Sequence, residues 1–287
     1  MGAAAFVEAA RPRTLAASVV PVVVGTAASG RWLPARFAGA LVVSVGLQVA
    51  VNYANDLFDA RRGVDSAARV GPRRAVAAGL VSARAMTIAV AAALTVAAVA
   101  GAALALVVGS ELFVVGALAI VAALGYSGGP RPYGDAGLGE AFVFVFFGLV
   151  ATIGSAYVQV ERVTMDAALV SIPVGFLAVG ILVANNLRDA RTDRDAGKIT
   201  LAVRLGAERT RTLYRMTVLA PFTVLPLIAG ATESAWPLVA FAALPLAAPP
   251  LRAMRSDDAP SHVRALVATA RLQAVFGALL AAGLWLA

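Results

Sequence analysis

Long apolar runs alternate with short polar segments along most of the chain. A helix that spans the hydrocarbon core of a bilayer needs about 20 apolar residues. The eighth run is short and rich in proline, which predicts a tilted or kinked helix there. We expect nine helices, at residues 14–30, 38–58, 85–108, 112–127, 139–158, 167–187, 212–230, 235–250 and 264–286. The pattern therefore predicts a single all-α, polytopic membrane domain over residues 1–287.

The charges between these runs predict how the helices are oriented. Cytoplasmic loops of membrane proteins carry an excess of Arg and Lys. With nine spans and a cytoplasmic N-terminus, only Arg31, Arg36 and Arg162 of the 24 basic residues fall in outside segments. We therefore expect a cytoplasmic N-terminus, an outside C-terminus and a place in the cell (inner) membrane. Cleavage of a signal peptide near residues 26–30 is the alternative, but eight more spans would follow it, so an uncleaved helix is simpler.

Composition agrees with a membrane protein and excludes several kinds of site. The chain is 60% hydrophobic and 14% charged, whereas soluble domains contain about 25% charged residues. It has no cysteine and one histidine, His262, which excludes disulfides, zinc thiolates, cysteine nucleophiles and a metal centre built from histidines. The net charge of +8 is typical of basic cytoplasmic loops, so we expect no nucleic-acid partner.

Two similar polar stretches end the second and sixth apolar runs. They cover residues 55–65 and 185–195, an offset of 130 positions. Aligned without a gap, they agree at Asn, Leu, Asp, Ala, Arg and the final Asp, and they hold six of the 16 carboxylates. Ionisable residues beside membrane-length apolar runs are costly and are usually functional. Both stretches would face the cytoplasm and lead into basic loops, 59–84 and 188–211.

Helical spacing gathers the polar side chains of each stretch on one face, at steps of three or four residues. Two such faces would make an oxygen-rich site for Mg²⁺, which combines a few carboxylates with water and phosphate oxygens. Basic residues of the adjoining loops would complete a diphosphate site. The candidate metal ligands are Asn55, Asp56, Asp59, Asp65, Asp189 and Asp193. The candidate diphosphate-binding residues are Asn52, Asn55, Arg61, Arg191, Lys198 and Arg204. The alternative is a set of juxtamembrane charges paired with nearby arginines; two matching copies on one side favour the metal site.

These motifs resemble the UbiA-type superfamily of intramembrane prenyltransferases, and within it the 1,4-dihydroxy-2-naphthoate polyprenyltransferases of menaquinone synthesis. The resemblance runs from Arg11 to Gly206. It is strongest in the two polar stretches, in the turn at 126–130 with 137–140, and at 197–206. Ubiquinone-type members usually have a carboxylate where this chain has Gly63, and the next one here, Asp65, comes two residues later. The naphthoate branch is similar in both respects, so the departure favours that branch.

The resemblance implies nine helices around a central cavity, with a cytoplasmic cap formed by the loops after the second and sixth helices. It implies Mg²⁺-dependent transfer of a polyprenyl group from polyprenyl diphosphate to 1,4-dihydroxy-2-naphthoate, with loss of diphosphate and CO₂, in contact with membrane lipid. The catalytic residues expected from it are Asp59, Tyr126, Arg131, Asp189, Asp193 and Lys198.

One alternative is another aromatic acceptor, such as 4-hydroxybenzoate. A secondary transporter, from a different function class, should carry its ionisable residues near the bilayer midplane, and here they lie at helix ends. Prenyl length and oligomeric state stay open.

Overall fold

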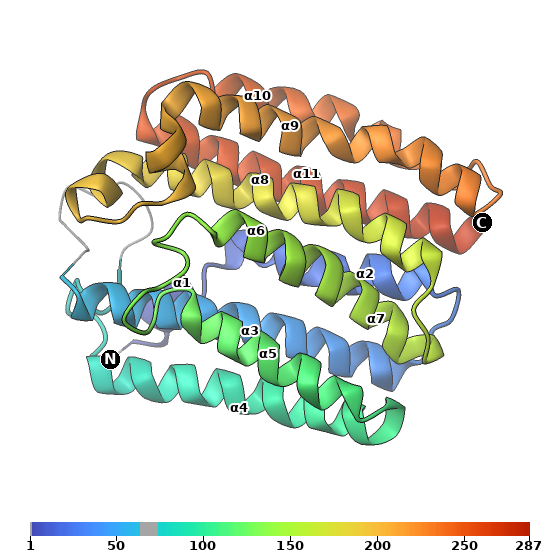
Figure 1. The fold of residues 1–287 in the computed structure, drawn as a ribbon, viewed down its shortest axis with the longest axis horizontal. Coiled ribbons are helices and arrows are strands. Elements are labelled where there is room, and N and C mark those ends of the chain that lie inside the picture. The colour runs from blue at the N-terminus through green and yellow to red at the C-terminus, as the bar shows by residue number, and fades with distance from the viewer. Residues whose placement is uncertain (1, 64–73) are drawn as a thin grey trace.

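The fold is a bundle of long helices that run roughly along one axis (Figure 1). The computed structural model describes residues 2–63 and 74–287. Among these residues, six helical segments are long and apolar enough to cross a membrane: α3 (Pro34–Arg61), α4 (Ala83–Val108), Gly139–Val160, α8 (Met165–Asp195), α9 (Leu201–Ala231) and α11 (Ala259–Leu286). Two shorter apolar helices, α2 (Ala16–Ala28) and α5 (Glu111–Gly125), accompany them. The expected all-α class of a multi-pass membrane protein is confirmed.

Two of the expected helices are irregular. The run at 139–158 forms α6 (Gly139–Val143), a π-helical segment η2 (Phe144–Val150) and α7 (Ala151–Val160). The proline-rich run forms a 3₁₀ segment, η3 (Trp236–Ala247), followed by α10 (Ala248–Ala253). Proline has no backbone N–H and disrupts the regular α-helical hydrogen-bond pattern, so the expected irregularity at η3 is confirmed.

The structure differs from the sequence prediction in one helix boundary and in one additional short helix. The helix expected to begin at residue 212 begins at Leu201, and it contains a break at Gly206, whose φ is 73°. Glycine occupies such left-handed conformations without the steric cost of a Cβ atom. The chain also begins with a short helix, α1 (Ala3–Ala9), followed by the 3₁₀ turn η1 (Pro12–Thr14). Neither α1 nor η1 is long enough to cross a membrane.

Close helix crossings rely on glycine. A Cβ atom on Gly25 of α2 would lie 2.1 Å from the carbonyl oxygen of Thr152 in α7. A Cβ atom on Gly277 of α11 would lie 2.4 Å from a methyl group of Val20 in α2. Small residues let helix backbones approach closely where lipid provides no hydrophobic driving force between helices. These crossings hold α2 between α7 and α11.

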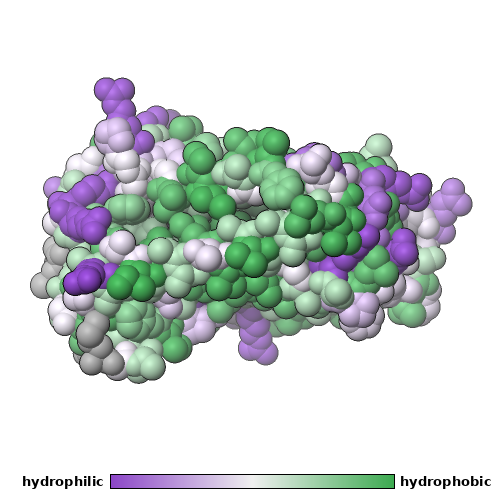
Figure 2. Space-filling model, turned by 90° about the horizontal axis from the view of Figure 1, so that it is seen from below, coloured by the Kyte–Doolittle hydropathy of each residue, from purple (hydrophilic) through white to green (hydrophobic). Residues whose placement is uncertain are grey.

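The described helices form three hydrophobic cores with polar ends beyond them. The largest core joins α2, α8, α9, η3 and α11, the second joins α1, α3, α4 and the segment around Ala75 and Val81, and the smallest joins α2, α3 and α7. Hydrophobic residues cover much of the middle of the molecule, and hydrophilic residues gather towards its ends (Figure 2). α1 and the C-terminal end of α11 lie at opposite ends of the long axis (Figure 1).

Candidate functional site

A cavity of about 940 Å³ lies among the helices, with polar groups concentrated at one end. The helix ends that carry the two polar stretches bound that end. The apolar lining includes Leu47, Val51, Phe146, Ile181 and Leu266. The charged and amide lining residues at the polar end include Glu8, Arg11, Arg13, Asn52, Asn55, Asp56, Arg74, Asn185 and Arg188. A cavity of this kind fits an amphiphile with an anionic head and a long apolar tail.

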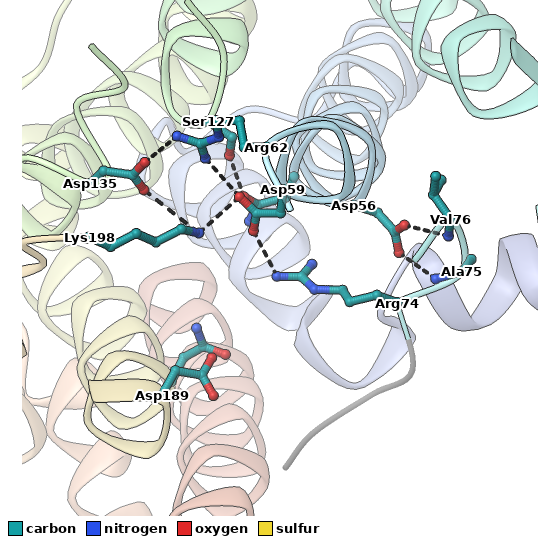
Figure 3. Close-up of polar contacts among 12 residues, drawn as sticks. Asp56, Asp59, Arg62, Arg74, Ala75, Val76, Ser127, Asp135, Asp189 and Lys198 are labelled. Carbon is teal, nitrogen blue, oxygen red and sulfur yellow. Dashed lines mark hydrogen bonds and ion pairs between the residues drawn. The ribbon is translucent and has the colours of Figure 1, made fainter. Parts of the chain in front are cut away.

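Asp59, near the end of α3, is the centre of the charged network (Figure 3). Its side chain is 1% exposed. Arg62 Nη2 donates to Oδ1 at 2.8 Å and Lys198 Nζ donates to the same oxygen at 2.9 Å. Arg74 Nη2 donates to Oδ2 at 3.1 Å. Three cations therefore converge on one buried carboxylate, and Lys198 brings the segment after α8 to the end of α3.

The other polar residues of α3 have different partners. Asp56 accepts the backbone N–H groups of Ala75 and Val76, both at 2.8 Å, so its two oxygens hold the segment before α4 (Figure 3). Asn52 donates to the carbonyl oxygen of Ala10 at 2.8 Å, which ties α1 to α3. The Oδ1 atom of Asn55 accepts the hydroxyl of Ser127.

The second polar stretch forms its own ion pair at the end of α8. Arg188 donates to Asp189 from Nε at 2.7 Å and from Nη2 at 2.6 Å. Arg188 also donates to Oδ1 of Asn185 at 2.8 Å. Both Arg188 and Asp189 are buried, with side chains 4% exposed. Asn185 and Arg188 line the cavity, whereas Asp189 is not part of its wall.

The turn between α5 and α6 closes the polar end. Tyr126 lines the cavity, and its ring packs edge-to-face against Tyr133 with 5.5 Å between centroids. Asp135 accepts a hydrogen bond from Arg62 and lies 3.8 Å from Lys198 Nζ. The turn thus connects to the cations around Asp59.

A buried carboxyl group lies behind this turn. Glu140 of α6 accepts a hydrogen bond from Nδ2 of Asn186 at 2.9 Å through Oε1, and its Oε2 atom has no partner among the described residues. A carboxylate at the start of a helix also interacts favourably with the helix dipole. Its contact with Asn186 links α6 to the second polar stretch.

Several candidate residues do not face the cavity. Arg61 is exposed and donates to the hydroxyl of Thr87 on α4. Arg131 and Arg191 are exposed and are not part of the cavity wall. Arg204 is exposed and contacts the carbonyl oxygen of Ile199. Asp193 is partly buried, and its carbonyl oxygen accepts the N–H of Lys198; Asp65 lies outside the described residues.

Arg74, Arg188 and Asp135 are parts of the network that sequence reasoning missed. The two arginines appeared only as basic loop residues. Arg188 carried a usable signal, because it immediately precedes Asp189 and follows Asn185 by three positions, so one helix turn could hold all three. Arg74 carried none, since it is 15 residues from Asp59 in sequence.

The donor chemistry fits Mg²⁺ that arrives together with a diphosphate. No group of three Asp, Glu or His side chains in the described part of the chain lies close enough to hold a metal ion. Asp59 and Asp189 are neutralised by basic side chains instead. Mg²⁺ is usually held by one or two carboxylates plus substrate phosphates. Asp59 and Asp189 supply carboxylate oxygens for such an ion, and the Arg and Lys side chains paired with them can bind the phosphate oxygens.

Comparison with known proteins agrees with this geometry. The profile of the UbiA prenyltransferase family matches residues 18–274. A 1,4-dihydroxy-2-naphthoate octaprenyltransferase from Mycobacterium tuberculosis is 42% identical over 85% of this chain and 84% of its own. The Escherichia coli protein of the same name is 33% identical over 92% and 89%. A solved UbiA homolog from Archaeoglobus fulgidus bound to DMAPP and Mg²⁺ shares the fold, with a TM-score of 0.67 and 15% identity over 96% of this chain and 98% of its own.

Proposed function

The chain belongs to the UbiA prenyltransferase family, and we propose that it transfers a polyprenyl group from a polyprenyl diphosphate to 1,4-dihydroxy-2-naphthoate. The products are demethylmenaquinone, diphosphate and CO₂. The observation that carries the choice of acceptor is the likeness, over most of the chain, to relatives named for this reaction. The amphipathic cavity supports it, because the donor and the acceptor both combine an anionic group with an apolar body.

The polar end of the cavity would bind the diphosphate of the donor. Arg74 and Arg188 line this end, and each is held by a carboxylate, Asp59 or Asp189. A guanidinium presents paired donors that match phosphate oxygens. Exchange of these arginines from carboxylate to phosphate would position the diphosphate while releasing the oxygens of Asp59 and Asp189.

Mg²⁺ is the cofactor of this proposal. Asp59, Asp189 and Asp193 would hold it, with Asn55 nearby, and Asp65 stays a candidate from the sequence. When bound, Mg²⁺ neutralises the negative charge that develops on the leaving diphosphate. Lys198, which already contacts Asp59, would stabilise the same charge.

The apolar part of the cavity would hold the prenyl tail and exclude water from the allylic carbon as the diphosphate leaves. Phe142 and Phe146 belong to this wall and continue the aromatic stack from Tyr133. Tyr126, which also lines the cavity, would contact the acceptor ring. Arg11 and Arg13 would offer cationic groups for the acceptor carboxylate, because they line the cavity and Arg131 does not.

The finer topology is part of the proposal. Nine membrane crossings, with α1 in the cytoplasm and the C-terminus outside, are supported by the distribution of basic residues. The opposite placement of α1 and the C-terminal end of α11 is consistent with an odd number of crossings (Figure 1). The loops after α3 and α8 would then cap the cavity from the cytoplasm.

The test is turnover by the purified protein with a polyprenyl diphosphate, Mg²⁺ and a panel of aromatic acceptors. We expect demethylmenaquinone from 1,4-dihydroxy-2-naphthoate, one CO₂ per prenyl group attached, and no turnover in excess EDTA until Mg²⁺ is restored. Transfer to 4-hydroxybenzoate with the carboxylate retained, and none to the naphthoate, would refute the acceptor assignment and leave the family intact. Full activity in EDTA would refute the metal assignment.

A further inference from the structure

One exposed stripe of α11 carries two arginines within a helix that is long and apolar enough to span a membrane. Pro260, Arg264, Val267 and Arg271 follow one another at steps of four, three and four residues, and all four are exposed. Such steps place residues on one face of a helix. The stripe therefore carries two exposed guanidinium groups next to residues of the cavity wall.

Arg271 lies well inside this helix. It is 12 residues after Ala259, the first residue of α11, which corresponds to about 18 Å at about 1.5 Å per residue. An arginine within the hydrocarbon region is costly unless its charge is paired or reaches the interface. Within the described part of the chain, Arg271 has no hydrogen bond or ion pair, and Arg264 donates only to the hydroxyl of Ser261, at 2.6 Å.

Arg271 lies seven residues after Arg264 on this stripe, which corresponds to about 10 Å along the helix. Side chains of an α-helix lean towards its N-terminus, and α11 begins at the end of the bundle that contains the polar part of the cavity. A long basic side chain can contact lipid with its stem while its charged head reaches back to the interface, so Arg271 would extend along the stripe towards Arg264.

Nearby acidic groups have other hydrogen-bond partners, although Asp258 also interacts electrostatically with Arg264. Asp257 pairs with Arg211, and Asp258 accepts hydrogen bonds from Ser256 and from the backbone and hydroxyl of Ser261. Pro260 and Val267 of the stripe line the cavity, but neither arginine does. The two guanidiniums therefore lie beside the cavity and outside it, where a lipid reaches them more directly than a bound donor.

We propose that Arg264 and Arg271 bind the phosphate headgroup of an anionic phospholipid at the edge of the cavity. Arg pairs with phosphate through paired N–H donors, and a basic residue near an anionic leaflet adds affinity for it. The acyl chains of this lipid lie along the apolar part of the stripe. The site is separate from the transferase chemistry, so this proposal does not depend on which aromatic acceptor the protein uses.

The test measures lipids retained by the full-length protein in nanodiscs of equal phosphatidylcholine and phosphatidylglycerol, by native mass spectrometry. We expect wild type to retain phosphatidylglycerol selectively, and Arg264→Gln/Arg271→Gln to lose about fivefold in that preference for each arginine removed. Arg215→Gln is the matched control, because Arg215 is an exposed arginine of α9 that donates only to Thr212. It should retain the wild-type preference.

Two outcomes would overturn the proposal. One is equal retention of phosphatidylglycerol by wild type and the double variant. The other is displacement of the retained phosphatidylglycerol by a stoichiometric amount of prenyl diphosphate, which would place the donor at these arginines. Arg264→Lys/Arg271→Lys keeps both charges and guards against a folding defect in the glutamine variant; it should retain part of the preference.

Discussion

At the scale of single residues, Asp59 concentrates the electrostatics of the site. It is almost fully buried and accepts hydrogen bonds from Arg62, Arg74 and Lys198. Hydrogen bonds to ionised groups contribute more to stability than neutral ones. The same carboxylate therefore organises the cations and is the metal ligand that we propose, so its loss should affect both stability and turnover.

We predict that Asp59→Asn lowers the free energy of unfolding by about 1–3 kcal/mol and turnover by about 10²–10³-fold. The amide keeps the shape but leaves the basic groups without their negative partner. Thermal unfolding in detergent and steady-state turnover measure the two effects. Asp135→Asn is the control, since Asp135 is 21% exposed and lies at the edge of the network. It should cost much less in both, and equal effects of the two variants would contradict the central role of Asp59.

Asp56 allows a sharper distinction between a metal ligand and a structural residue. The sequence predicts a metal ligand there, whereas the structure gives both of its oxygens to the N–H groups of Ala75 and Val76. We predict that Asp56→Asn speeds proteolysis in the segment 74–81, because an amide nitrogen cannot accept one of these bonds. Its turnover should stay low at saturating Mg²⁺. Recovery of wild-type turnover by added Mg²⁺, with proteolysis unchanged, would favour the metal role instead.

The residue types at the site could be predicted from the sequence, but their partners could not. Spacing placed Asn55, Asp56 and Asp59 on one helix face, and the fold brings Lys198 to Asp59. Which oxygen accepts from which donor depends on how α3 meets the segment after α8, 139 residues later. The pairing of Arg74 depends on the same tertiary arrangement, so no local pattern indicates it.

At the scale of elements, apolar length was the reliable signal. Runs without interruption became long helices close to their expected ranges, such as α4 and α11. The π-helical segment at Phe144–Val150 was not predictable, because it depends on packing against α8 rather than on local propensity. The early start of α9 was missed because its first turn is short and is separated from the long apolar run by the break at Gly206 and by charged residues.

The helix crossings give a prediction at this scale. We expect Gly25→Ala to lower the free energy of unfolding by about 1–3 kcal/mol, because the added methyl group meets the backbone of Thr152 and overpacking costs about that much. Gly230→Ala is the matched control, since a Cβ atom there meets nothing within 4 Å. Thermal unfolding in the same detergent compares them. A fully tolerated Gly25→Ala would show that α2 and α7 can separate without cost.

At the scale of the whole molecule, the bundle has one polar functional end and an opposite end where α11 finishes. Hydropathy predicted the membrane class, because uninterrupted apolar runs suffice for it. The shape and volume of the cavity could not be predicted, since they depend on side chains from α3, α5, α8 and α11 that are distant in sequence. Orientation in the membrane follows from charge and gives the last prediction.

We predict that reporter fusions after Ala287 and within residues 231–234 both lie outside the cytoplasm, and that a fusion after Asp195 lies inside. The reason is the excess of basic residues on one side of the expected spans. Paired reporters, one active only in the cytoplasm and one only outside it, measure each position. A cytoplasmic C-terminus would contradict an odd number of crossings.

The ion pair between Lys198 and Asp59 also has a consequence in time. Lys198 is synthesised 139 residues after Asp59, which at about 5–20 residues per second is on the order of ten seconds. During that interval the nascent chain holds Asp59 with Arg62 and Arg74 as its only basic partners from this network. α3 is therefore in the membrane for that interval before Lys198 can pair with Asp59 at its end. A quality-control factor that detects unpaired charge at helix ends could act on the nascent chain during this time.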